Sequence, residues 1–279
     1  MTIAAVGAAA LPMLLWAAAA LVAVSALLAP PWLKERRRAR LRARPFPAAW
    51  RRILRHRVPI VTRLPAELQL RLKRHIQVFI AEKPFIGCQG QLITHEVRVT
   101  IAAQACLLLL GHERSDCFPR LRQILVYPGA FVANRERPLD AGLVQQQRRS
   151  MSGESWTQGQ VIISWADAVA GAADPTDGHN VALHEFAHQI DQDSGVADGR
   201  PWRANPATRR RWAKVMGEAL ERLRHEPSTL IDGYGATDPA EFFAVVTEVF
   251  FERPQELAAE APAVYGELAQ LYRVDPMAW

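Results

Sequence analysis

The chain has 279 residues, of which 49% are hydrophobic, and this allows a sizeable apolar core in one large domain or two small ones. Three cysteines form no CxxC pair, and their odd number argues against a disulfide framework and for a reducing compartment. The net charge is +6, but residues 34–44 alone hold seven basic residues and one acidic residue, so the remainder is close to neutral and no nucleic-acid partner is expected.

The N-terminal region predicts a membrane anchor. Residues 1–33 carry no charged side chain, and the segment Ile3–Ala29 is long enough to span a bilayer. A cleaved signal peptide would need basic residues before the apolar segment, and a buried soluble helix is rarely uncharged over this length. The basic segment 34–44 indicates the cytoplasmic flank of the span and would attract anionic lipid headgroups, although it would also suit an arm that binds nucleic acid.

We therefore divide the chain into an anchor with its basic flank at residues 1–45 and a globular domain at residues 46–279. The anchor would make this a single-pass protein of the inner membrane, with the globular domain on the cytoplasmic side. Without the anchor, the protein would be cytoplasmic.

The globular domain is predicted to be mostly helical with a small sheet, an α+β fold. Hydrophobic periodicity, capping residues and runs of β-branched residues indicate where its elements lie. Helices are expected at 66–83, 94–110, 181–190, 207–225, 239–251 and 255–272. Strands are expected at 124–127, 130–132 and 161–165, and the polar segment 138–152 is expected to be an exposed loop.

One helix carries the pattern HExxH, from His184 through Glu185 to His188. Residues four apart share a helix face, so both imidazoles can bind one Zn²⁺, and Glu185 can reach a water bound to that ion as a general base. The chain has four His-Glu pairs, but only this one has a second His four positions after the first. Two unrelated surface histidines are the other reading, which the apolar residues around them disfavour.

A catalytic zinc site needs a third protein ligand and an open position for water. A third His six residues after His188 is excluded, because Ser194 stands there. A carboxylate from a later helix is the other option, and Glu241 is the best candidate. Asp238, Pro239 and Glu241 also form a capping box, so Glu241 could instead cap its own helix.

The strand expected at 161–165 precedes the HExxH helix, an order in which many zinc peptidases add an extended substrate to a sheet edge. With these residues in place, the chain resembles the Mlc titration factor A family of zinc-dependent peptidases. The resemblance is carried by residues 97–110, 163–165, 178–191 and 234–251.

The resemblance implies a zincin-like metallopeptidase domain similar to that of anthrax lethal factor. It also implies aminopeptidase-type activity and, in some members, binding to the glucose repressor Mlc. The family pattern places the third ligand at Glu241 and a tyrosine at Tyr234. The best-known members are soluble cytoplasmic proteins, so the N-terminal span departs from the family pattern.

The predicted function is zinc-dependent hydrolysis of peptide bonds in a peptide or protein substrate. Two imidazoles and one carboxylate would hold Zn²⁺: His184, His188 and Glu241. Glu185 would be the base, and Tyr234 would donate a hydrogen bond to the oxyanion or be an ordinary loop aromatic. Two further carboxylates would either orient these groups or pair with nearby cations: Asp191 and Glu248.

Two other functions compete with this prediction. The first is a membrane-tethered binding protein that sequesters a cytoplasmic transcriptional regulator such as a Mlc-like repressor, with zinc only stabilising the fold. Glu185 argues against it, because a structural zinc site needs no base and usually has a fourth protein ligand. The second is a nucleic-acid-binding protein that uses residues 34–44, and the near-neutral remainder argues against it.

Overall fold

The computed structural model describes residues 32–112, 118–139, 143–151, 153–156, 159–193, 197–201 and 205–279, together with Trp16 and Gly195. The expected membrane span, Ile3–Ala29, lies outside these residues except for Trp16. No described helix combines the length and the apolar character that a membrane crossing requires. The chain forms two compact units, Met1–Pro45 and Phe46–Trp279. In the first unit, residues 32–43 form a helix.

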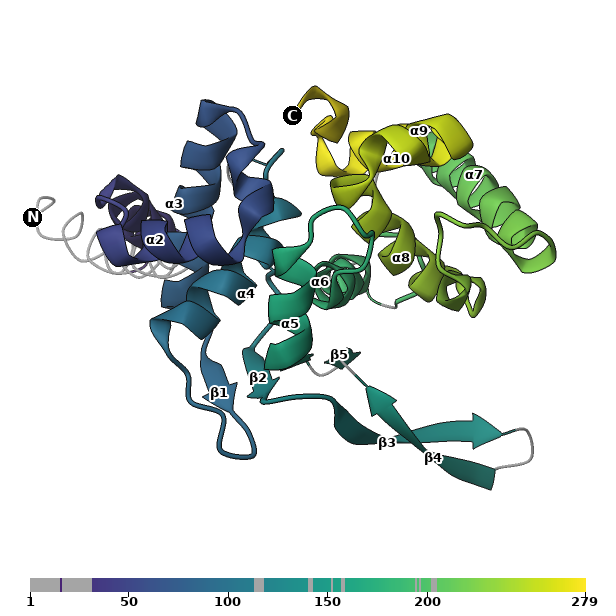
Figure 1. The fold of residues 1–279 in the computed structure, drawn as a ribbon, viewed down its shortest axis with the longest axis horizontal. Coiled ribbons are helices and arrows are strands. Elements are labelled where there is room, and N and C mark those ends of the chain that lie inside the picture. The colour runs from purple at the N-terminus through teal and green to yellow at the C-terminus, as the bar shows by residue number, and fades with distance from the viewer. Residues whose placement is uncertain are drawn as a thin grey trace, which may run out of the picture. The chain divides into compact units, whose positions relative to one another are not determined.

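The second unit is mostly helical with a small sheet, which confirms the α+β prediction (Figure 1). Its helices are α2 (Ala48–Arg57), α3 (Ala66–Glu82), α4 (His95–Leu107), α5 (Trp165–Ala173), α6 (Val181–Gln192), α7 (Pro206–His225), α8 (Pro239–Glu252), α9 (Pro254–Glu260) and α10 (Pro262–Tyr272). Single 3₁₀ turns form η1 (Pro59–Thr62), η2 (Gly233–Ala236) and η3 (Pro276–Ala278). The strands are β1 (Phe85–Gly87), β2 (Gln123–Tyr127), β3 (Phe131–Leu139), β4 (Leu143–Met151), β5 (Gly153–Trp156) and β6 (Gln160–Ser164).

The main sheet has the strand order β1-β2-β6-β5. Strands β1, β2 and β6 are parallel, and β5 is antiparallel to β6 at the edge of the described sheet. The strand expected at 161–165 is therefore β6, and its prediction as the substrate-binding edge is wrong. Neighbouring strands occupy both of its sides, so its backbone groups are already paired, and the edge strands of the described sheet are β1 and β5.

Strands β3 and β4 form a separate hairpin that projects from the helices in Figure 1. They pair from Phe131 with Met151 to Leu139 with Leu143. The prediction of a loop at 138–152 is therefore wrong, because residues 143–151 are a strand. Its run of Gln and Arg has no apolar alternation to mark a strand, but ladder pairing satisfies backbone groups whatever the side chains are.

Two element boundaries also differ from the predictions. Trp165 does not end a strand but begins α5, because the Ser164 side chain accepts the N–H of Asp167 and caps a helix there. The single helix expected at 255–272 is two helices, α9 and α10. Pro262 opens the second one, since a proline has no N–H to continue the first helix but is favourable at a helix start.

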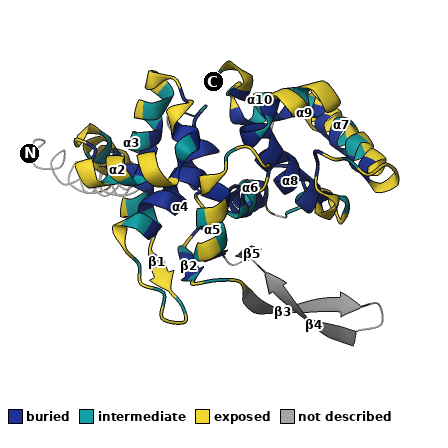
Figure 2. Ribbon diagram, in the orientation of Figure 1, coloured by how far each residue is buried: buried dark blue, intermediate teal, exposed yellow. Residues whose placement is uncertain are grey.

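The core lies along three helices, α4, α6 and α8, which carry most of the dark blue ribbon in Figure 2. Helix α6 packs against both α4 and α8. Its Phe186 is fully buried, with ring centroids 5.7 Å from Phe79 and 5.0 Å from Phe118. Burying one such side chain stabilises the fold by about 1.5–3 kcal/mol. This packing anchors the apolar face of α6 and leaves the face of His184 and His188 toward α8.

Candidate metal centre

Helix α6 begins at a side-chain cap. The Asn180 side-chain oxygen accepts the N–H of Leu183 at 3.0 Å and so caps the helix. Helix α8 begins in the same way, because one oxygen of Asp238 accepts the N–H groups of Ala240 and Glu241 at 2.9 and 3.0 Å. The cap of α8 is thus made by Asp238.

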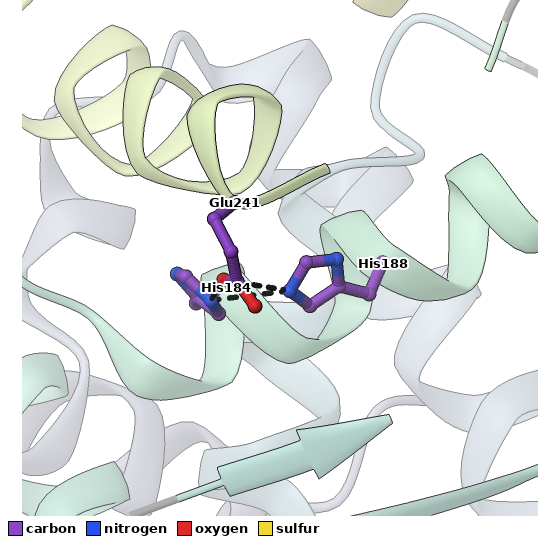
Figure 3. A group of neighbouring side chains, drawn as sticks. All are labelled: His184, His188 and Glu241. Carbon is purple, nitrogen blue, oxygen red and sulfur yellow. Dashed lines mark hydrogen bonds and ion pairs between the residues drawn. The ribbon is translucent and has the colours of Figure 1, made fainter. Parts of the chain in front are cut away.

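The carboxylate of Glu241 faces the two imidazoles and not its own helix end (Figure 3). Its Oε2 lies 3.0 Å from His184 Nε2 and 3.3 Å from His188 Nε2, and the two Nε2 atoms are 3.2 Å apart. A tetrahedral zinc ion with bonds of about 2.0–2.1 Å keeps its ligand atoms roughly 3.3 Å apart. The three donor atoms therefore have the chemistry and the spacing that such an ion needs.

The electrostatics of this group favour a cation. Burial lowers the pKa of His184, but hydrogen bonds with Glu241 and Glu248 outweigh burial and raise it well above its usual value. Burial raises the pKa of Glu241, but the hydrogen bonds from both imidazoles bring it below the usual range of a carboxyl group. Burial lowers the pKa of His188. A carboxylate and two buried imidazoles thus converge on one point, where a divalent cation can replace the proton between them.

Glu248, one of the two carboxylates with an open role, lies behind His184. Its Oε1 is 2.7 Å from His184 Nδ1, on the side of the ring opposite Glu241. A carboxylate in this position fixes the ring orientation and leaves Nε2 for a metal. Asp191 does something else, because its Oδ2 accepts the N–H of Gly199 at 2.7 Å and so holds the segment after α6.

The backbone of the α6 cap is held by a second carboxylate from α8 that the sequence reasoning missed. Glu252 accepts the N–H of Gly178 at 3.2 Å and the side-chain N–H of Asn180 at 3.0 Å. The same amide group donates to the carbonyl of Gly171 at 3.1 Å. The available signal was the spacing of Glu248 and Glu252, which places two carboxylates one turn apart on an otherwise apolar helix.

The two residues expected to act in catalysis are neighbours of His184, one in sequence and one in space. Glu185 is buried, with 5% of its surface exposed, and directly follows His184. Tyr234 lies in η2 with its ring centroid 6.1 Å from that of His184, and 42% of its surface is exposed. Helix α8 packs against η2, so the segment that carries Tyr234 is fixed by the helix that carries Glu241.

Sequence comparison agrees with this geometry. The family model described as glucose-regulated metallo-peptidase M90 matches residues 32–273. The chain is 40% identical over 253 residues to the uncharacterized protein slr2042 of Synechocystis, which covers 89% of this chain and 91% of that protein. It is 35% identical over 228 residues to Mlc titration factor A of Salmonella arizonae, which covers 78% of this chain and 88% of that protein.

The α+β fold and the group of two histidines and one glutamate, which could hold a metal ion, are consistent with a metallopeptidase-type domain. With a family model that covers most of its length, the chain belongs to the glucose-regulated metallopeptidase M90 family. The resemblance to the Mlc titration factor A family is thereby confirmed.

Proposed function

We propose that this protein is a zinc-dependent peptidase that hydrolyses peptide bonds. The observation that carries the proposal is the convergence of His184, His188 and Glu241, with donor atoms 3.0–3.3 Å apart. Three protein ligands leave a fourth position open, which is the composition of a catalytic and not of a structural zinc site. When bound, zinc supplies Lewis-acid activation of a water molecule and of the scissile carbonyl.

The chain's own residues would perform the proton transfers. Glu185 takes a proton from the attacking water and passes it to the leaving amine, so a carboxylate buried next to His184 serves as base and then as acid. The Tyr234 hydroxyl donates a hydrogen bond to the negative charge that develops on the scissile carbonyl oxygen. Its exposed position beside His184 suits a group that meets the substrate. Glu248 holds the His184 ring in place.

Two finer features belong to the same proposal. The activity is of the aminopeptidase type, as the family resemblance implies. The protein is held at the inner membrane by Ile3–Ala29, with the peptidase domain in the cytoplasm. Supporting this orientation, the seven basic residues of the segment 34–44 follow the span directly.

Replacing Glu185 tests the proposal. Glu185→Gln should keep bound zinc and fold but lower peptidase activity at least about a hundredfold, because a positioned base contributes that much. Metal content and hydrolysis of a peptide mixture are measured together, with Glu218→Gln on the exposed face of α7 as the matched control. Undiminished activity of a metal-loaded Glu185→Gln protein would remove the assignment.

The name of the relative Mlc titration factor A supports a second candidate, the sequestration of a transcriptional regulator such as a Mlc-like repressor. Sequestration needs no base, so Glu185→Gln should capture a purified Mlc-like repressor as well as the wild type does. Capture by both proteins, with no hydrolysis by either, would favour this second function over the first.

A further inference from the structure

A cavity of about 840 Å³ lies at the C-terminal end of α6 and is separate from the metal ligands. It is bounded by the segment before β2, by the start of β6 and by the last turn of α6. The lining residues that bear on its chemistry are Arg120, Arg122, Gln123, Gly159, Gln160 and Gln192.

The cavity is positively charged. Arg120 and Arg122 are exposed, and no ion pair among the described residues involves either guanidinium group. The other polar side chains that line it are glutamine amides, and none of its described lining residues is acidic. Guanidinium groups bind carboxylates and phosphates through paired, charge-assisted hydrogen bonds, and in a peptide substrate the group of this kind is a carboxylate.

The two arginines are held by a close backbone contact and do not sit on a free loop. The carbonyl of Gly159 accepts the N–H of Arg122 at 2.7 Å. Gly159 has φ +80°, and a Cβ at this position would lie only 2.4 Å from the carbonyl oxygen of Arg120. Glycine is therefore needed where the start of β6 passes the two arginines.

The cavity lies about one helical turn beyond the metal ligands along α6. Gln192 lies four residues after His188, one turn or about 6 Å further along the helix. Helix α6 packs against both β5 and β6. A peptide bound near the metal is thus within about two residues of the cavity, since an extended chain advances about 3.3 Å per residue.

The sheet gives this peptide a direction. Strand β5 is the edge strand of the described sheet that packs against α6, and its Trp156 pairs with Gln160 at the cavity end of β6. A peptide that pairs antiparallel with β5, the more stable arrangement, runs in the same direction as β6. Its N-terminal part then lies at the cavity, before the scissile bond.

We propose that Arg120 and Arg122 form a subsite for the acidic side chain of the residue directly N-terminal to the scissile bond, which is the first residue of an aminopeptidase substrate. This inference rests on the proposed peptidase function and names its substrate class, acidic peptides. The ligand group is the side-chain carboxylate of Glu or Asp.

Matched peptides test this subsite in the full-length protein in detergent. Peptides that differ only by Glu or Gln at the first residue, directly before the scissile bond, should show a kcat/KM ratio of about ten in favour of Glu. In Arg120→Gln/Arg122→Gln the ratio should fall to about one. The control Arg209→Gln/Arg210→Gln, on the exposed face of α7, should keep the wild-type ratio. Equal cleavage of both peptides by the wild type would overturn the proposal.

Two further measurements complete the test. If the double variant does not fold, the wild-type ratio is measured against salt, and it should shrink between roughly 0.05 and 0.5 M salt because the contact is between exposed charges. Glu moved to the C-terminal side of the scissile bond should give no preference, and a preference there would overturn the assigned direction.

Binding separates this inference from the proposed function. Glu185→Gln protein should bind the Glu peptide about tenfold more tightly than the Gln peptide in fluorescence anisotropy. If the wild type cleaves neither peptide but this difference in binding is found, the peptidase assignment fails and the carboxylate subsite stands. If binding is equal, the subsite fails whether or not cleavage occurs.

Discussion

Two residues at the start of α8, Asp238 and Glu241, have different roles, although the sequence pattern of a capping box would assign both to the helix end. Asp238 accepts two backbone N–H groups and caps the helix, while the Glu241 carboxylate contacts both imidazoles. The pattern of a capping box would let Glu241 turn back to the helix end. The imidazoles compete for the same carboxylate and provide a stronger, charge-assisted contact.

This division predicts different outcomes for two substitutions. Glu241→Gln should lower zinc affinity by more than about a hundredfold, because losing a ligand costs more than losing a group that orients one. Asp238→Ala should keep the metal and lower the free energy of unfolding by about 0.5–2 kcal/mol, the usual cost of a lost cap. Zinc titration and denaturant unfolding of both variants measure this. Tight metal binding by Glu241→Gln, with weak binding by Asp238→Ala, would mean that Asp238 is the ligand.

At the scale of elements, two buried carboxylates of α8 bind the first part of α6 and the residues just before it. Glu248 holds the His184 ring, and Glu252 holds the backbone and side chain around Asn180. Burial raises the pKa of Glu252 to about 9, with nearby Asp177 and Glu248 adding to the effect and the hydrogen bond from Asn180 opposing it. The junction is therefore most stable with Glu252 protonated.

The raised pKa gives stability a definite dependence on pH. In the unfolded chain Glu252 ionises near its ordinary pKa of 4.5, but in the folded protein it keeps its proton up to about 9. Its stabilising contribution is complete below pH 4.5 and is lost as pH rises through 9. Across this window the unfolded state binds fewer protons, so the free energy of unfolding falls by up to about 1.4 kcal/mol per pH unit.

Denaturant unfolding of residues 46–279, a compact unit with its own core, measures this dependence. The difference in unfolding free energy between the wild type and Glu252→Gln should decrease steadily from pH 6 to pH 9, because glutamine does not titrate. Glu218→Gln on exposed α7 should show no such trend. Parallel curves for wild type and Glu252→Gln would show that Glu252 is already ionised in the folded protein.

At the scale of the whole molecule, the N-terminal segment determines which compartment the globular domain occupies. We propose that the apolar segment Ile3–Ala29 remains in the membrane with the basic segment 34–44 on the cytoplasmic side. Moving seven basic residues across the membrane would oppose both the charge bias and the membrane potential.

Fusion reporters and membrane fractionation test this topology. A reporter fused after Trp279 should be active if it requires the cytoplasm and inactive if it requires the periplasm. The protein should pellet with membranes and resist a high-salt wash, since an inserted segment is held by hydrophobic burial and salt does not screen it. Release by salt would show that the segment lies on the membrane surface and does not span the bilayer. An active periplasmic reporter would reverse the topology.

The local part of the site was readable from the sequence alone. The spacing of His184 and His188 follows from the 3.6-residue period of a helix, and the caps at Asn180 and Asp238 follow from side chains that bond to nearby N–H groups. The long apolar helices were predicted for the same reason, because helix periodicity and capping are local properties of the chain. The α+β class followed from the order of these elements.

Contacts between segments that are far apart in the chain could be determined only from the tertiary structure. It placed Glu241 at the imidazoles and not at its own helix end, assigned Glu248 to His184 and Asp191 to Gly199, and showed that β6 is an inner strand. Each of these outcomes depends on contacts between residues far apart in the chain. The competing local arrangements differ little in free energy, so the packing of α6 against α8 and the pairing of β5 with β6 select between them.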